Sequence, residues 1–193
     1  MKNVLQLLRL LFMEIEITLR PLKLNDIDDE YCNWYENNDG HLNYFSGSGK
    51  IFNRDILLRD FESSIPDENY FHYLISEKSG ARIGNIKIGP VDNKNKTSDL
   101  VCLIGNRSFI GKGIGSRAIA IASELAFKKH DIRRLHGGMH ANNLSSIRAY
   151  TKAGWFIEGT FKGYYLLNGV ATDRVCVACL NPSYFSIKTD ANN

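Results

Sequence analysis

Alternating apolar and polar residues predict the strands of this chain. Alternation points successive side chains to opposite faces of a strand, so that one face can be buried. Two turns, at 77–80 and at Asn168-Gly169, indicate hairpins, and Asn-Gly favours a tight two-residue turn. The predicted strands cover 14–20, 70–77, 81–91, 98–105, 133–140, 155–167 and 170–180.

Apolar residues at helical spacing predict four helices, which cover 24–38, 53–65, 114–129 and 143–154. Asparagine is a good N-cap, and the predicted caps are Asn25, Asn53, and either Asn142 or Asn143. The helix at 114–129 has its apolar stripe at Ile114, Ala118, Ile121, Ala122 and Leu125. Consecutive strands come first along the chain, and one strand–helix–strand unit sits in the middle. This order predicts a mixed sheet with helices on its faces, not an alternating doubly wound fold.

The composition is that of an ordinary single-domain globular protein, with 193 residues, 44% hydrophobic and 23% charged. The net charge of +3 suits a small anionic ligand and is too weak to favour nucleic acid. Four scattered cysteines predict no disulfide framework, which favours a reducing, cytoplasmic location.

Two residue pairs raise the question of a metal site. Cys176 and Cys179 lie three residues apart in a strand pattern, so their thiols point to opposite faces. His136 and His140 would share a strand face but stand about 13 Å apart at the rise of a strand. We therefore predict no bound metal.

The two ends of the chain fall outside the predicted domain, which covers 14–185. Residues 1–13 form an extension that can be helical, and Arg9 interrupts its short apolar run. Such a run is far below the roughly 20 residues of a membrane-spanning helix, so no span is predicted. Residues 186–193 are predicted to form a flexible tail.

The stretch 109–119, FIGKGIGSRAI, has three alternating glycines around a lysine at the start of a predicted helix. Glycines let backbone N–H groups approach an anion, and a helix N-terminus adds its dipole. A dinucleotide fold needs an acidic residue after the next strand, but Asp131 precedes that strand. A triphosphate-binding loop needs Ser or Thr where Gly113 stands. A pyrophosphate cradle explains the glycines better than a turn that only starts a helix.

This stretch, the run N-x-x-S-x-x-x-Y-x-x-x-G at 143–154 and NGVATDRV near the end together resemble the GNAT superfamily of N-acetyltransferases. The chain is most similar to the branch of ribosomal-protein N-terminal and amino-sugar nucleotide acetyltransferases. The resemblance implies an α/β (α+β) fold, with a mixed, mostly antiparallel central sheet and helices on both faces. It also implies acetyl-CoA as cofactor and direct transfer to an amine, and it leaves a homodimer open.

The resemblance further implies which residues hold the cofactor. The amides of 111–116 would bind pyrophosphate, with Lys112 adding charge, and a splayed strand at 102–104 would pair with pantetheine. Ile110 departs from the family's usual Gln or Arg, which matters little because the donors are backbone amides. The implied residues are Cys102, Leu103, Ile104, Ile110, Gly111, Lys112, Gly113, Ile114, Gly115, Ser116, Asn143, Ser146 and Tyr150.

Acetyl transfer also needs an acid, a base and a donor to the oxyanion. Tyr150 matches the family's tyrosine that protonates the thiolate, although it could simply pack on the sheet. Asp99 is the predicted base, with Glu36 and His41 as alternatives. A backbone N–H near Leu103 would serve the oxyanion.

Aromatic side chains between 31 and 52 predict the acceptor site, because aromatic faces suit a sugar ring or a base. At least half of these side chains are expected to pack in the core instead. The predicted acceptor residues are Trp34, Glu36, His41, Tyr44 and Phe45. The first choice of acceptor is a nucleotide-linked amino sugar, and the alternative is a protein or peptide N-terminus. A non-catalytic acyl-CoA-binding module ranks below both.

Overall fold

The computed structural model describes residues 15–36, 40, 42–44, 52–65 and 69–185. The predicted extension at 1–13 and tail at 186–193 lie outside these ranges, so the predicted domain limits stay a prediction. The elements are β1 (Ile17–Pro21), η1 (Leu24–Asp26), α2 (Asp29–Asn33), α3 (Arg54–Ser64), β2 (Phe71–Glu77), β3 (Arg82–Asp92), β4 (Thr97–Ile104), η2 (Arg107–Phe109), α4 (Ile114–Lys129), β5 (Arg134–His140), α5 (Leu144–Lys152), β6 (Phe156–Leu167), β7 (Val170–Leu180) and α6 (Pro182–Phe185).

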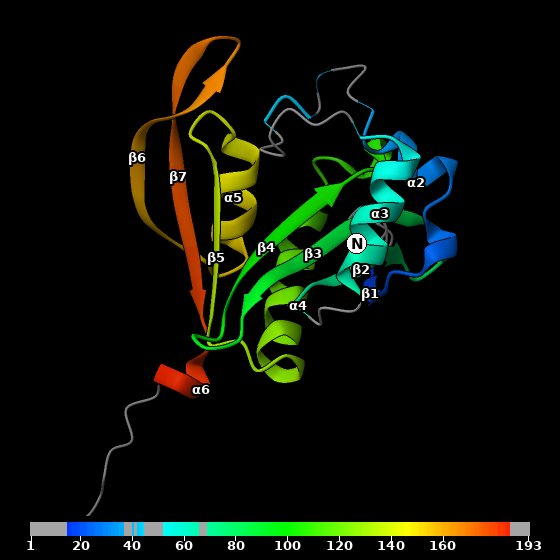
Figure 1. Ribbon diagram of the computed structural model, residues 1–193, viewed down its shortest axis with the longest axis horizontal. Helices are drawn as coiled ribbons and strands as arrows, with labels where there is room; N and C mark the ends of the chain where they lie inside the picture. Colours follow the sequence, from blue (N-terminus) through cyan, green and yellow to red (C-terminus); the bar gives the residue numbers. More distant parts are fainter. Residues whose placement is uncertain (1–14, 37–39, 41, 45–51, 66–68, 186–193) are drawn as a thin grey trace, which may run out of the picture.

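A seven-stranded sheet forms the centre of the molecule, in the order β1-β2-β3-β4-β5-β7-β6 (Figure 1). Neighbouring strands are antiparallel except for β4 and β5, which are parallel. The mixed, mostly antiparallel sheet predicted from the sequence is therefore confirmed.

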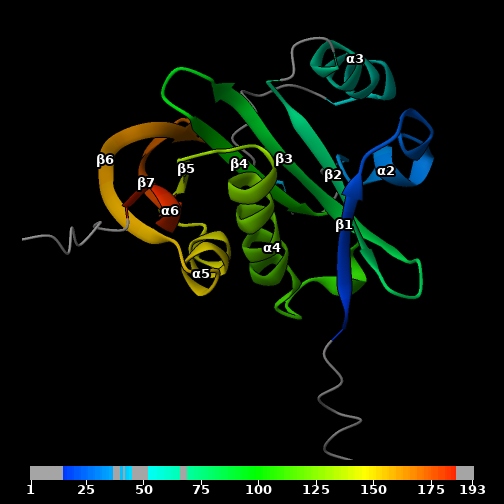
Figure 2. The same ribbon diagram turned by 90° about the horizontal axis from the view of Figure 1, so that it is seen from below.

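Helices cover both faces of this sheet. Figure 2 shows α4 and α5 on one face and α3 on the other. Leu100 of β4 joins the larger hydrophobic cluster, with Ile119 of α4. Leu103 of the same strand joins a smaller cluster, with Leu57 of α3 and Trp34. Because the two clusters lie on opposite faces, β4 is held from both sides.

The first predicted helix is shorter than its sequence pattern indicates. Residues 24–26 form a single 3-10 turn, and α2 starts only after Asp28, whose side chain accepts a bond from the N–H of Tyr31. Asn25 is therefore not the N-cap. The same carboxylate pairs with Arg82 of β3 at 2.7 Å, which fixes the helix start against the sheet.

The other helices keep their predicted positions. Asn53 caps α3 and Asn143 caps α5, each by accepting a bond from a backbone N–H three residues later. On α4 the buried stripe includes Ile119 and Ala126, whereas Ile121 is 39% exposed. The predicted stripe of α4 is therefore partly wrong.

Cys176 and Cys179 are free thiols. Among the described residues, no group of three or more His, Cys, Asp or Glu side chains could hold a metal ion. Within the same residues, no helix combines the length and the apolar character of a membrane span.

Candidate active site

Strands β4 and β5 pair over only three residues and then separate. The parallel pairing joins 97–99 to 134–136. Beyond this point β4 diverges from β5, and α5 lies across the opening between them (Figure 1). The sheet therefore has a gap beside residues 100–104, where the resemblance implies a splayed strand.

The pairing of β4 with β3 decides which backbone groups face this gap. The N–H of Gly105 donates to the carbonyl of Ile83 at 3.0 Å, and Leu103 lies opposite Asn85. Hydrogen-bonded pairs alternate along an antiparallel ladder. Leu103 is therefore bonded toward β3, and the N–H and carbonyl of Cys102 face the gap.

A side-chain bond agrees with this assignment. The Tyr150 hydroxyl, which comes from α5, donates to the carbonyl of Leu100 at 2.7 Å. Leu100 and Cys102 are two residues apart, so their backbone groups point to the same side of β4. The predicted oxyanion donor was a backbone N–H near Leu103, and the register makes the N–H of the neighbouring Cys102 the one that faces the gap.

The glycine-rich turn at 111–113 leads directly into α4. Gly111 and Gly113 have φ of +78° and +72°, and Gly113 is the N-cap of the helix. A Cβ at either glycine would meet no described residue within 4 Å. Glycine is therefore needed for the left-handed backbone, not for lack of room. The space before the turn is open, and the N-terminus of a 16-residue helix favours an anion there.

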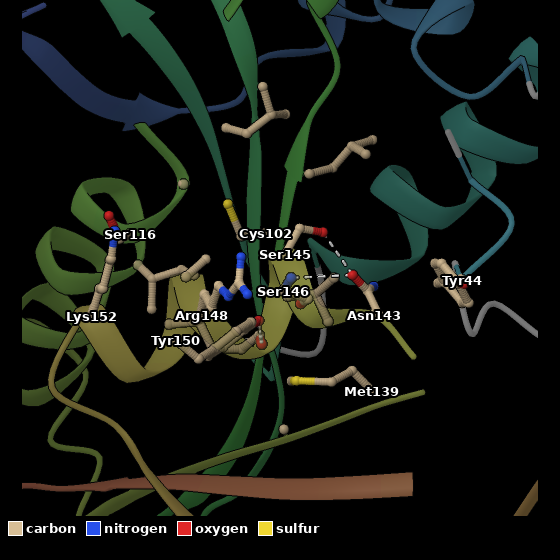
Figure 3. Close-up of a pocket in the computed structure, with 18 of the residues that line it drawn as sticks. Tyr44, Cys102, Ser116, Met139, Asn143, Ser145, Ser146, Arg148, Tyr150 and Lys152 are labelled. Atoms are coloured by element: carbon tan, nitrogen blue, oxygen red, sulfur yellow. Dashed lines mark hydrogen bonds between the residues drawn. The ribbon is translucent and has the colours of Figure 1, made fainter. Parts of the chain in front are cut away.

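A cavity of about 1030 Å³ joins this turn to the gap in the sheet. In Figure 3, Ser116 and Lys152 lie at one end and Tyr44 at the other, with Cys102 and Tyr150 between them. The predicted site residues that line the cavity are Tyr44, Asp99, Cys102, Leu103, Ile104, Ile110, Gly111, Gly113, Ile114, Gly115, Ser116, Asn143, Ser146 and Tyr150.

Helix α5 brings positive charge to the cavity. Arg148 and Lys152 line it, one helical turn apart. Lys112 is not among the lining residues, and its ammonium lies 5.4 Å from the centroid of the Phe109 ring. Arg148 and Lys152 therefore offer charge besides Lys112, whose predicted role stays a prediction. The i, i+4 spacing of Arg148 and Lys152 was the sequence signal that could have revealed this pair.

Asn143 and Ser146 form the start of α5 at the cavity wall. The Asn143 side chain accepts bonds from the N–H of Ser146 at 3.1 Å and from the Ser145 hydroxyl at 2.9 Å. This geometry confirms Asn143 as the N-cap of α5, and its implied role toward the cofactor stays a prediction.

Tyr150 is buried, with 6% of its surface exposed, and its ring packs edge-on against Trp155. Burial raises the pKa of its hydroxyl, and the nearby Cys102 and Asp99 add to the rise. Tyr150 therefore stays protonated at neutral pH. As a neutral hydroxyl it carries the proton that a general acid must supply.

Asp99 lies at the last paired position of β4, opposite His136 of β5. Its carboxylate is 3.4 Å from Nε2 of His136. Burial raises the pKa of the Asp99 carboxyl, and the charges of His136 and Arg174 oppose this rise. A carboxylate with a raised pKa at the cavity wall is a better proton acceptor than an exposed one.

Aromatic rings gather at the end of the cavity near Tyr44. Tyr44 lies 5.7 Å from His140, which stacks on Tyr165 at 4.1 Å between ring centroids. Tyr164 and Tyr165 of β6 line the same cavity. The sequence analysis placed the acceptor site only in 31–52 and missed the β6–β7 hairpin. The signal that could have revealed it is the pair Tyr164-Tyr165, just before the Asn168-Gly169 turn.

Two of the predicted acceptor residues do not reach the cavity. Trp34 is buried and packs so closely on Gly105 that a Cβ there would lie 2.1 Å from the indole. It is a core residue, and its predicted acceptor role is wrong. Glu36 does not line the cavity either, and its carbonyl accepts a bond from Arg107. His41 and Phe45 lie outside the described residues.

This geometry agrees with the comparisons with known proteins. The family model of the acetyltransferase (GNAT) domain matches residues 16–155. The chain belongs to the GNAT acetyltransferase family. It is therefore an acetyltransferase, and acetyl-CoA is the cofactor.

Individual proteins that match most of the chain have low sequence identity to it. The chain is 25% identical over 175 residues to a probable N-acetyltransferase, YjcK, of Bacillus subtilis, covering 86% of this chain and 94% of that protein. It is 23% identical over 165 residues to spermidine N(1)-acetyltransferase of Escherichia coli, covering 83% and 85%. Spermidine N-acetyltransferase of Vibrio cholerae, solved with CoA and spermine, has the same fold, with a TM-score of 0.77 and 18% identity over 88% of this chain and 98% of that one.

Proposed function

We propose that the protein transfers acetyl from acetyl-CoA directly to the primary amine of a small molecule bound at the Tyr44 end of the cavity. The observation that carries this proposal is the continuity of the cavity from the glycine turn, past the gap, to the aromatic rings. Direct transfer needs both ligands in one space, close to the groups that move protons.

The cavity residues suit acetyl-CoA, which supplies an activated acetyl thioester. The backbone amides of 111–116 would bind the pyrophosphate at the helix start. Arg148 and Lys152 would add charge-assisted bonds to phosphate oxygens. The Cys102 carbonyl and the gap-facing backbone groups of Ile104 would pair with the pantetheine amides, since no strand among the described residues pairs with them on this side. The Leu100 carbonyl already accepts from the Tyr150 hydroxyl.

Three groups of this chain would handle the charges of the reaction. Asp99 would take a proton from the acceptor ammonium, leaving the neutral amine as nucleophile. The N–H of Cys102 would donate to the carbonyl oxygen as negative charge develops there. Tyr150 would give its proton to the sulfur as the C–S bond breaks, and its phenolate would take the second proton that the nitrogen loses as the amide forms.

The acceptor that we propose first is a nucleotide-linked amino sugar, because the faces of Tyr44 and Tyr165 suit a sugar ring or a base. The relatives named for spermidine favour a polyamine as the second candidate. A protein N-terminus is the third. A cytoplasmic location and a homodimer remain predictions.

A screen of acetyl-CoA consumption with amino-sugar nucleotides, spermidine and N-terminal peptides tests this proposal. We expect turnover with amino-sugar nucleotides and a matching acetylated product by mass spectrometry. Binding of acetyl-CoA without turnover on any amine would favour the non-catalytic module instead.

Asp99→Asn is expected to lower kcat about 100-fold, within the usual range for losing a general base. Because burial raises the pKa of Asp99 above 3.8, wild-type kcat should fall as pH decreases through that raised pKa. The measurement is kcat against pH, which reports groups in the enzyme–substrate complex. An acid limb that persists unchanged in Asp99→Asn would assign the base to another group.

A further inference from the structure

One guanidinium at the acceptor end of the cavity has no carboxylate partner among the residues that the structure describes. Arg174 of β7 lines the cavity, and its side chain lies across Gly138 of β5. A Cβ at Gly138 would lie 1.9 Å from Nε of Arg174, so glycine is what makes room for this side chain. The guanidinium carbon is 4.9 Å from the centroid of the Tyr164 ring.

The Arg174 side chain is held in place and bonds with the Tyr164 side chain, but it is not fully satisfied. Its Nε is buried without a hydrogen-bond partner among the described residues. Other arginines on the sheet differ, because Arg20, Arg82 and Arg134 each pair with a carboxylate. A buried guanidinium donor that lacks a partner is costly, and its planar fork matches a carboxylate or a phosphate.

The charges around Arg174 limit which amine can bind beside it. Within the described part of the chain, Asp99 is the single carboxylate that lines the cavity. The acceptor end therefore offers one negative and one positive group. A polyamine would bring a second ammonium toward Arg174, where like charges repel. A molecule with one amine and one anionic group would satisfy both.

We propose that the acceptor carries a carboxylate or phosphate that binds Arg174, so that this enzyme acetylates anionic amines in preference to polyamines. This inference rests on the proposed function and specifies its substrate class. It separates this chain from relatives named for spermidine, and it is compatible with a nucleotide-linked amino sugar.

Matched acceptors test the inference. The carboxylate arm compares β-alanine with 3-aminopropanol, and the phosphate arm compares 2-aminoethyl phosphate with 2-aminoethanol and glucosamine 6-phosphate with glucosamine. Spermidine is the polycationic member. We expect kcat/KM to be about 10- to 100-fold higher for the anionic member in at least one arm, as for one charge-assisted contact. The arm with the larger preference shows whether the anionic group of the acceptor is a carboxylate or a phosphate.

Two variants assign the preference to Arg174. Arg174→Met should remove the 10- to 100-fold advantage, read as the ratio of kcat/KM for the anionic and the uncharged members, because the charge of Arg174 also acts on Asp99. Gly138→Ala retains the arginine but forces its guanidinium aside, and it should have the same effect. Gly137→Ala is the matched control, because its Cβ approaches Val177 no closer than 3.5 Å and does not meet Arg174. Its ratio of anionic to uncharged acceptors should equal that of the wild type.

A binding measurement separates this inference from the proposed function. Calorimetric titration of the same amines into the enzyme saturated with CoA needs no turnover. If no amine is acetylated, the proposed function fails, while a preference for anionic amines that Arg174→Met abolishes still supports the inference. Equal affinity or equal kcat/KM for charged and uncharged members, or a preference for spermidine, would overturn the inference and leave the acetyltransferase activity standing.

Discussion

Gly113→Glu is expected to weaken acetyl-CoA binding at least 100-fold. The substitution places a carboxylate in the open space before the N-terminus of α4, where the amides would meet the pyrophosphate. It also forces a φ of +72° on a residue with a Cβ, which costs about 1 to 2 kcal/mol. Calorimetric titration with acetyl-CoA measures the loss.

Gly169→Glu is the matched control for this change. Gly169 has a φ of +78°, and a Cβ there also meets nothing within 4 Å, but it lies in the β6–β7 turn. The backbone penalty should be similar, while acetyl-CoA affinity should stay within about twofold of the wild type. If Gly113→Glu binds acetyl-CoA as well as Gly169→Glu does, the turn is not the phosphate site.

Tyr150→Phe is expected to lower kcat about 100- to 1000-fold, within the usual range for losing a general acid, with acetyl-CoA affinity nearly unchanged. The ring can keep its packing on Trp155, so the change removes the hydroxyl alone. The Leu100 carbonyl loses its bond from this hydroxyl, and unfolding should become easier by about 1 to 3 kcal/mol. Single-turnover kinetics and thermal denaturation measure the two effects.

Tyr73→Phe controls for the loss of a half-buried hydroxyl. Tyr73 lies in the same hydrophobic cluster, and its hydroxyl is 2.7 Å from Nε2 of His130, away from the cavity lining. This variant should lose stability but retain the wild-type kcat. A Tyr150→Phe enzyme that turns over at the wild-type rate at every pH would remove Tyr150 from the chemistry.

Local patterns were enough to predict much of the fold. The periodicity of 114–129 predicted α4 over its full length, and Asn168-Gly169 predicted the β6–β7 hairpin. Asn25 failed as a cap because Asp28 gains a salt bridge to Arg82, which is distant in sequence. Propensity near one helix cannot reveal such a tertiary partner.

The site was harder to predict for the same reason. Leu103 and Cys102 are adjacent in sequence, and only the register with β3 shows which N–H faces the gap. Trp34 and Tyr44 are both aromatic, yet one fills the core and the other lines the cavity. Arg174 meets Gly138 across two strands, a contact that no local pattern contains.

A crystal structure of the protein with CoA tests the central claim most directly. We expect the pyrophosphate to accept bonds from the amides of 111–116. The pantetheine should lie in the gap beside 100–104, with its sulfur near the Tyr150 hydroxyl. A pyrophosphate bound away from this turn, or a pantetheine outside the gap between β4 and β5, would contradict the account.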